Sequence, residues 1–400
     1  MVAATRRTRA EIAAIGFSVV LSCATGATHA DDTDKQWRVE QLLMRFSYFN
    51  QHGFGYQSQA GPGPRGSELL NVWNPSVMLV ARQNERVQHS VTMPVDIITS
   101  ASTDSIDAVT SASRSNETVS LDINTALAAS KEDLVTFRYG AHLEEWYRSV
   151  FGGLAYVRDL AQNNATFGVS VNGYFDVFIP YGPTGDFTPP GNERDSRSAL
   201  NANAEVTQIL SRTTLVKASY GFTWQAGALL TPWNSVPVGC DPDVTECEGR
   251  VQERFPNERL RHAFYGLLAQ HVPVTHSTIR FGYRYYFDDY DVHAHTMTTE
   301  LYQYVTPRAY LRASYRLHNQ NAVYFWTRSL AVLDPESDTP RTSDSDLAAF
   351  WSHELGGKLV VYMDPTAGLA SNQLEFSFSH YWRTNDLWVD VFTFGYGRLF

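Results

Sequence analysis

The sequence predicts an all-β protein, a transmembrane antiparallel β-barrel of about 16 strands with long outer loops and short periplasmic turns. Two observations predict it. Apolar and polar side chains alternate along one segment after another, and no mature segment is apolar enough for a membrane-spanning helix of ~20 residues. Charged residues make up 18% and aromatic residues 13% of the 400 residues. Soluble domains carry about a quarter charged residues, so this chain is poor in charge.

The N-terminus predicts an export signal. Arg6, Arg7 and Arg9 precede an apolar stretch over 12–26, and Thr28-His29-Ala30 offers a small-residue cleavage site. Residues 1–30 are therefore expected to be a signal peptide, and 31–400 a single outer-membrane barrel domain. Two other interpretations are a twin-arginine signal at Arg6-Arg7 and a lipoprotein signal that ends at Cys23.

The alternation is clear over 279–288. Ile279, Phe281 and Tyr283 share one face of the predicted strand, and Arg280 and Arg284 share the other. Such segments exceed the ~5–6 residues of ordinary strands and match the ~9–11 of a membrane strand. The predicted strands are 37–49, 68–82, 86–99, 116–128, 133–144, 147–159, 165–179, 199–210, 213–225, 258–270, 276–288, 292–304, 307–319, 346–361, 372–384 and 387–400.

An even number of strands places both chain termini in the periplasm. The long connections, such as 180–198, 226–257 and 320–345, then all fall on the outer side. The inner connections are mostly short, as at 83–85 and 211–212. The last strand carries alternating aromatic residues and ends at Phe400, like the assembly signal of outer-membrane barrels. We therefore expect outer-membrane lipid and the barrel-assembly machinery as partners, and the bacterial outer membrane as the location.

Two motifs suggest a family. Residues 94–102 read P-V-D-I-I-T-S-A-S and are followed by T-S-A-S at 110–113; residues 281–296 read F-G-Y-R-Y-Y-F-D-D-Y-D-V-H-A-H-T. Together they resemble the bacterial family called domain of unknown function 3570. The sequence departs from the family pattern at Tyr290, where Trp is usual, and at Ala294, where Ser is usual. The resemblance implies an outer-membrane barrel of uncharacterised role.

Charged side chains on the predicted lumen faces are candidate selectivity residues. The bases come from two nearby strands and the acids from the opposite side. They are Arg280, Arg284, Arg308, Arg312 and Arg316 on one side, and Asp96, Asp122, Glu144, Asp176 and Glu205 on the other. These opposed rows of basic and acidic side chains would create a transverse electric field that selects permeating solutes. Alternatively, the same residues neutralise one another as ion pairs in a packed lumen.

Two further groups are candidate metal or redox features. His293, His295 and Met297 share one face of a predicted strand, the geometry of a soft-metal site, although that face points toward lipid if Leu301 continues it. Cys240 and Cys247 are expected to form a local disulfide after export. A metal site formed by these cysteines and nearby carboxylates is the alternative.

The small hydroxylated residues at 99–102 and 110–113 flank Asp104 and Asp107. They suggest either a hard-cation site or a polar outer loop packed against the wall. No cofactor is predicted.

The chain lacks G-x-S-x-G and H-E-x-x-H motifs, so no enzymatic activity is predicted. Its net charge of −10 argues against nucleic acid as a partner. The predicted function is a channel or transporter for small polar solutes or ions. The alternative is a plugged barrel that serves as scaffold or binding partner for a periplasmic lipoprotein, redox protein or metal-handling protein.

Overall fold

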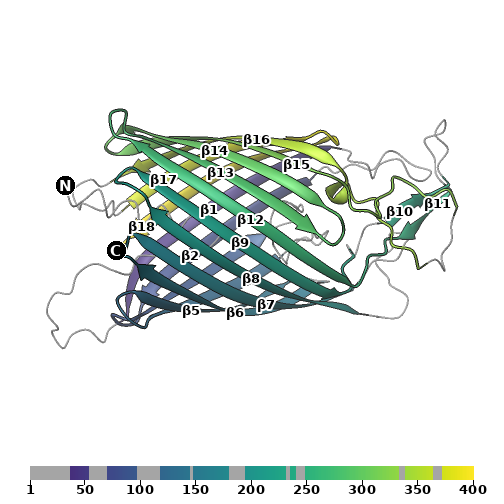
Figure 1. Cartoon of the computed structure of the whole chain (residues 1–400), viewed down its shortest axis with the longest axis horizontal. Helices are drawn as coiled ribbons and strands as arrows, with labels where there is room; N and C mark the ends of the chain where they lie inside the picture. The colour runs from purple at the N-terminus through teal and green to yellow at the C-terminus, as the bar shows by residue number, and fades with distance from the viewer. Residues whose placement is uncertain are drawn as a thin grey trace.

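Antiparallel strands follow one another around a single closed sheet (Figure 1). The computed structural model describes residues 37–53, 70–96, 118–144, 147–179, 194–230, 235–239, 248–332, 338–363 and 372–400. The barrel strands are β1 (Arg38–Gly53), β2 (Leu70–Arg82), β3 (Val87–Asp96), β4 (Thr118–Ala128), β5 (Asp133–Leu143), β6 (Tyr147–Leu160), β7 (Ala165–Phe178), β8 (Asp195–Ile209), β9 (Thr214–Gly227), β12 (Glu258–Val272), β13 (Ser277–Asp288), β14 (His293–Thr306), β15 (Ala309–Gln320), β16 (Phe350–Tyr362), β17 (Asn372–Arg383) and β18 (Leu387–Leu399). Outside the barrel, β10 (Ser235–Val238) and β11 (Gly249–Gln252) form a separate hairpin, and Ser345–Leu347 form a 3-10 helix, η1.

The sheet closes between its first and last strands. β1 pairs with β18 from Gln41 opposite Leu399 to Gly53 opposite Leu387. Closure leaves no strand edge, which a sheet must achieve in lipid because hydrocarbon cannot bond to free backbone groups. The predicted fold class, an antiparallel barrel of sixteen strands, is confirmed.

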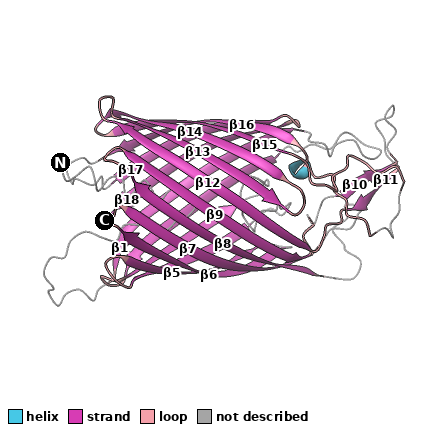
Figure 2. Ribbon diagram, in the orientation of Figure 1, coloured by secondary structure: helices cyan, strands magenta, loops and turns pink. Residues whose placement is uncertain are grey.

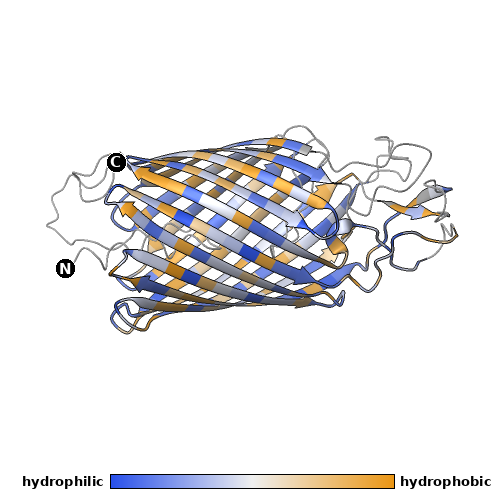
Figure 3. Ribbon diagram, turned by 90° about the horizontal axis from the view of Figure 1, so that it is seen from above, coloured by the Kyte–Doolittle hydropathy of each residue, from blue (hydrophilic) through white to orange (hydrophobic). Residues whose placement is uncertain are grey.

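The alternation of side chains matches the prediction. On β13, Ile279 and Phe281 point outward with 46% and 43% of their surfaces exposed, and Arg280 between them points inward and is 9% exposed. Hydrophobic and hydrophilic residues accordingly alternate along the strands in Figure 3. An apolar outer wall thus surrounds a polar lumen.

The two ends of the barrel differ. One end, which we call the turn end, carries the start of β1, the C-terminus and the short turns 83–86, 129–132, 161–164, 210–213, 273–276 and 307–308. The other, the loop end, carries the connections 228–257, 289–292 and 321–349. Figure 2 shows η1 and the β10–β11 hairpin at the loop end. These three connections therefore lie at one end of the barrel, as the even number of predicted strands implied.

Several details differ from the predicted boundaries. The strand predicted at 346–361 begins at Phe350, because Asp344 accepts a hydrogen bond from the backbone N of Asp346 (2.9 Å) and starts η1 there. Arg308, expected on a lumen-facing strand, lies in the exposed turn before β15, where its backbone N donates to Oγ1 of Thr306 (3.1 Å). The predicted loop 226–257 contains the β10–β11 hairpin.

Candidate functional site

A wall of arginine side chains faces the lumen from β12, β13 and β15. We call this set the arginine wall: Arg259, Arg261, Arg280, Arg284, Arg312 and Arg316. The inward faces of β12 to β15 carry only two carboxylates, Asp288 and Glu300. Glu300 lies 3.5 Å from Nη1 of Arg280 and 3.4 Å from Nη1 of Arg312. On the inward faces of these four strands, arginines therefore outnumber carboxylates by six to two.

The predicted lumen acids lie on the other side of the barrel, with bases on adjacent strands. Asp122 pairs with Arg138 and Asp176 with Arg197, each at 2.7 Å. Glu205 pairs with Lys217 at 2.7 Å. These acids are thus neutralised by cross-strand neighbours rather than across the lumen.

Glu144 follows β5 and lies near the loop end. Its Oε1 is 3.1 Å from Nε2 of His142, and Nδ1 of the same ring is 2.5 Å from Oγ of Ser120. Ser120 and His142 are directly opposite in the β4–β5 register. This chain of hydrogen bonds fixes the orientation of the His142 ring in the lumen. Of the predicted acids, Asp96 has a side chain outside the described residues.

Asp122, Asp176 and Glu205 therefore do not pair with the predicted lumen arginines, and the role of the lumen charges in selectivity stays a prediction. Strand order places β4, with Asp122, half-way round the barrel from β14, with Glu300. On β4 to β9, Asp122, Asp176 and Glu205 are each paired with a base, whereas on β12 to β15 arginines outnumber carboxylates. This difference in the number of charges between the two sides of the described strand faces gives the lumen a transverse field.

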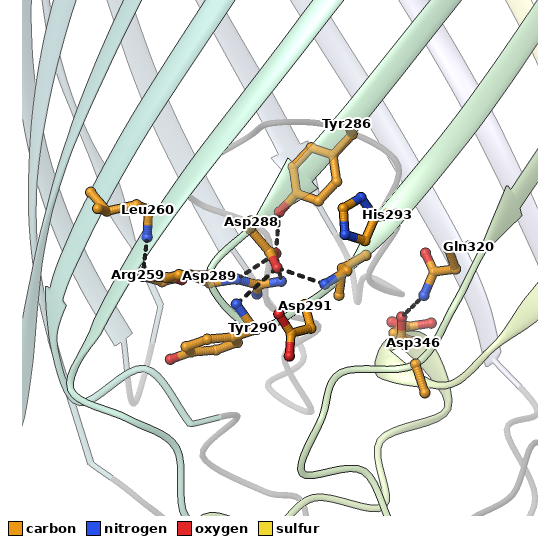
Figure 4. Close-up of polar contacts among 12 residues, drawn as sticks. Arg259, Leu260, Tyr286, Asp288, Asp289, Tyr290, Asp291, His293, Gln320 and Asp346 are labelled. Carbon is orange, nitrogen blue, oxygen red and sulfur yellow. Dashed lines mark hydrogen bonds and ion pairs between the residues drawn. The ribbon is translucent and has the colours of Figure 1, made fainter.

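Asp288, in the second family motif, is the centre of a buried hydrogen-bond network at the loop end, which we call the hub (Figure 4). Oδ2 of Asp288 accepts hydrogen bonds from Nε of Arg259 (3.0 Å) and the hydroxyl of Tyr286 (2.6 Å), and Nη2 of Arg259 also contacts it. Oδ1 accepts from the backbone N of Tyr290 and of Val292, both at 3.0 Å. The Asp288 side chain is fully buried. The conspicuous acidic motif therefore builds a turn rather than an open ligand site.

That turn supports an apolar cap over the loop end. The cap is the apolar cluster of Tyr290, Val292, Val323, Phe325 and Leu347, and Phe255 and Leu229 pack against it. Phe325 is 7% exposed, because the loop 321–349 folds back onto the turn that follows β13.

The two long loops of the cap are joined to each other and to the barrel. Isolated bridges pair Arg254 with Arg341 and Val238 with Leu330. Nε2 of Gln320 donates to the carbonyl oxygens of Asp346 (2.9 Å) and Ala348 (2.8 Å). Arg383 of β17 forms an ion pair with Asp346. The loop 321–349 is thereby held at the mouth of the lumen.

One acidic group lies buried where the two loops meet. Glu253 is 3% exposed, and its Oε1 accepts a hydrogen bond from Oγ1 of Thr342 (2.6 Å). Burial, and then the nearby carboxylate of Asp344, raise the pKa of Glu253 well above its usual value. Ionisation of Glu253 therefore weakens the contact between the loops.

The predicted histidine strip points outward, as its alternation with Leu301 suggested. Nδ1 of His295 lies 2.7 Å from the Tyr283 hydroxyl, and Nδ1 of His293 lies 2.9 Å from that of Tyr285. Met297 is also exposed on this face. Across the described part of the chain, no group of three or more His, Cys, Asp or Glu side chains is arranged to hold a metal ion. Metal binding by the strip stays a prediction, and its geometry also suits an aromatic belt.

Other predicted features lie outside the described residues. These are the signal peptide, both Thr-Ser-Ala-Ser segments with Asp104 and Asp107, and the cysteines Cys240 and Cys247.

Sequence reasoning missed Arg259, Arg261, Glu300 and Glu253. The first three lie at alternating positions of strands that were predicted, so the same alternation would have placed them in the lumen. Glu253 had no such signal, because its burial depends on a contact between two loops.

The comparisons with known proteins identify the family. The model of the family described as "Protein of unknown function (DUF3570)" matches residues 19–386, so the chain belongs to this family. No curated protein matches the sequence significantly. In the described residues, no helix is long and apolar enough to cross a membrane.

Solved structures show similarity at low sequence identity. The chain is similar to "CymD monoaromatic hydrocarbon channel", with 12% identity, a TM-score of 0.40, and 90% of this chain and 88% of that chain covered. It is also similar to a BenF-like porin from Pseudomonas fluorescens, with 8% identity, a TM-score of 0.43, and coverage of 90% and 99%. A third, Pseudomonas aeruginosa OccK2 in complex with glucuronate, has 8% identity, a TM-score of 0.43, and coverage of 90% and 96%.

Proposed function

We propose that this protein is a channel or transporter for small polar solutes or ions in the bacterial outer membrane. The observation that carries the proposal is the charge distribution inside the barrel. Six arginines and two carboxylates face the lumen from β12 to β15, whereas the acids Asp122, Asp176 and Glu205 are each paired with a base. Charges arranged in this way orient and select solutes in a pore.

Reconstitution in planar bilayers tests the proposal. The wild-type protein is expected to show discrete single-channel conductance. Arg312→Glu reverses a charge of the arginine wall, so the reversal potential in a salt gradient should shift toward cation preference. Lys131→Glu makes the same change in an exposed turn at the turn end and should leave selectivity nearly unchanged. A correctly folded barrel that stays electrically silent contradicts the proposal.

The cap supports a second candidate function. Loops packed over the mouth suit a closed barrel that acts as a scaffold or binds a periplasmic redox or metal-handling protein. Pull-down from outer-membrane extracts with the full-length protein tests this alternative. A silent barrel that retains a specific periplasmic partner supports it, and a conducting barrel with no partner contradicts it.

A further inference from the structure

One residue of the arginine wall has no partner. Arg261 forms no hydrogen bond or ion pair in the described part of the chain, and its Nε is buried with no acceptor. Buried donors are almost always satisfied, because an unmet hydrogen bond is costly. An unpartnered guanidinium in a lumen therefore requires an explanation.

The carboxylate nearest in register is already occupied. Arg261 lies opposite Asp288 in the β12–β13 pairing. Both oxygens of Asp288 are used by other donors: Oδ2 by Arg259 and Tyr286, and Oδ1 by the backbone of Tyr290 and Val292. Asp288 therefore has no acceptor left for the guanidinium of Arg261.

The residue on the other side is a second unpartnered group. Arg261 lies opposite Thr223 in the β9–β12 pairing. The Thr223 side chain faces the lumen, is completely buried, and has no hydrogen-bond partner at Oγ1. Residues directly opposite on antiparallel strands have Cβ atoms about 5 Å apart. A guanidinium and a hydroxyl, both without partners, thus stand side by side.

Together the two groups are suited to an anion. Arginine presents a planar set of donors that matches the oxygens of a carboxylate or phosphate, and a hydroxyl adds one more donor. The nearest charged neighbours are Arg259, two residues along the same strand, and Asp288, opposite Arg261 on β13, so the three groups together carry one net positive charge. An incoming cation would be repelled here, and an anion would be attracted.

We infer that Arg261 and Thr223 form a binding subsite for the oxyanion group of a solute, either a carboxylate or a phosphate. The subsite lies at the loop end of the lumen, beneath the cap. This inference rests on the proposed channel function, because it specifies the class of solute that the channel would bind.

Direct binding measures the subsite separately from conduction. Purified wild-type protein in detergent is titrated calorimetrically with inorganic phosphate and, in a second arm, with acetate. Arg261→Gln should weaken binding of the preferred anion about tenfold or more, the effect of losing a charged hydrogen-bonding group. Thr223→Val should weaken it less. Arg45→Gln is the matched control, since Arg45 is also a lumen arginine but already pairs with Glu375 at 3.4 Å, and should change affinity less than about twofold.

The possible results distinguish failure of the proposed subsite from failure of the proposed channel function. Heat-modifiable migration on gels verifies that each variant is folded, and Arg261→Lys, which keeps the charge, should retain part of the affinity. If the wild type binds neither anion, or if folded Arg261→Gln binds as tightly as the wild type, the subsite is refuted even where the barrel conducts. If binding depends on Arg261 but the barrel is silent, the subsite stands and the proposed channel function fails. The arm with the larger affinity identifies the carboxylate or the phosphate as the preferred group.

Discussion

Replacing Asp288 by Ala tests whether the hub holds the cap. Asp288 satisfies Arg259, the Tyr286 hydroxyl and two backbone N–H groups, and its side chain is fully buried. Removing one partner of a buried ion pair costs about 3–5 kcal/mol, because the remaining charge is left without compensation. At about 1.4 kcal/mol per tenfold change, the open state of the cap should become at least about a hundredfold more populated.

Limited proteolysis of the folded protein in detergent measures that opening. Trypsin cleavage after Arg328 and Arg341, both in the cap loop 321–349, should accelerate strongly in Asp288→Ala. The barrel itself should stay folded, because the β13–β14 ladder from Ser277 to Phe287 does not involve this side chain. Asp289→Ala is the matched control, since Asp289 is exposed and accepts one hydrogen bond, from the backbone N of Leu260 (3.0 Å). Equal cleavage rates in the two variants would refute the reasoning.

Three other changes have definite expected outcomes. The pKa of Glu253 is raised in the folded protein, so its contribution to cap stability is complete at pH below its pKa in the unfolded chain, about 4.3. This contribution is lost as the pH rises through the pKa of Glu253 in the folded protein. Glu253→Gln should remove the pH dependence of the cap's protease resistance, and an unchanged pH profile in the variant would contradict this expectation. In Gly140→Val the new Cβ would lie 2.1 Å from the Leu121 carbonyl oxygen and 2.4 Å from the Phe151 ring. The free energy of unfolding of the barrel, measured in urea, should therefore fall by about 1–3 kcal/mol. Gly357→Val is the control, because a Cβ there meets nothing within 4 Å, and it should be nearly neutral. If Cys240 and Cys247 form the predicted disulfide, alkylation of the denatured protein should label both only after reduction; labelling without reductant would exclude the bond.

The sequence by itself determined the membrane architecture. The strand predicted at 276–288 is β13, Ser277–Asp288, and Arg280 and Arg284 face inward as the alternation required. The reason is physical: a membrane strand must present an apolar side chain to lipid at every second residue, so its length and its faces are both encoded locally. The even number of strands also predicted which connections lie at each end of the barrel.

Only the tertiary structure decided how the charged groups combine. Glu300 lies between Arg280 and Arg312 because of the register of three strands, and Arg261 lacks a partner because Asp288 is occupied by the turn after β13. The burial of Phe325 and Glu253 likewise depends on two loops that meet over the lumen. These contacts join residues that are distant in the chain, and local alternation carries no information about which of them come together.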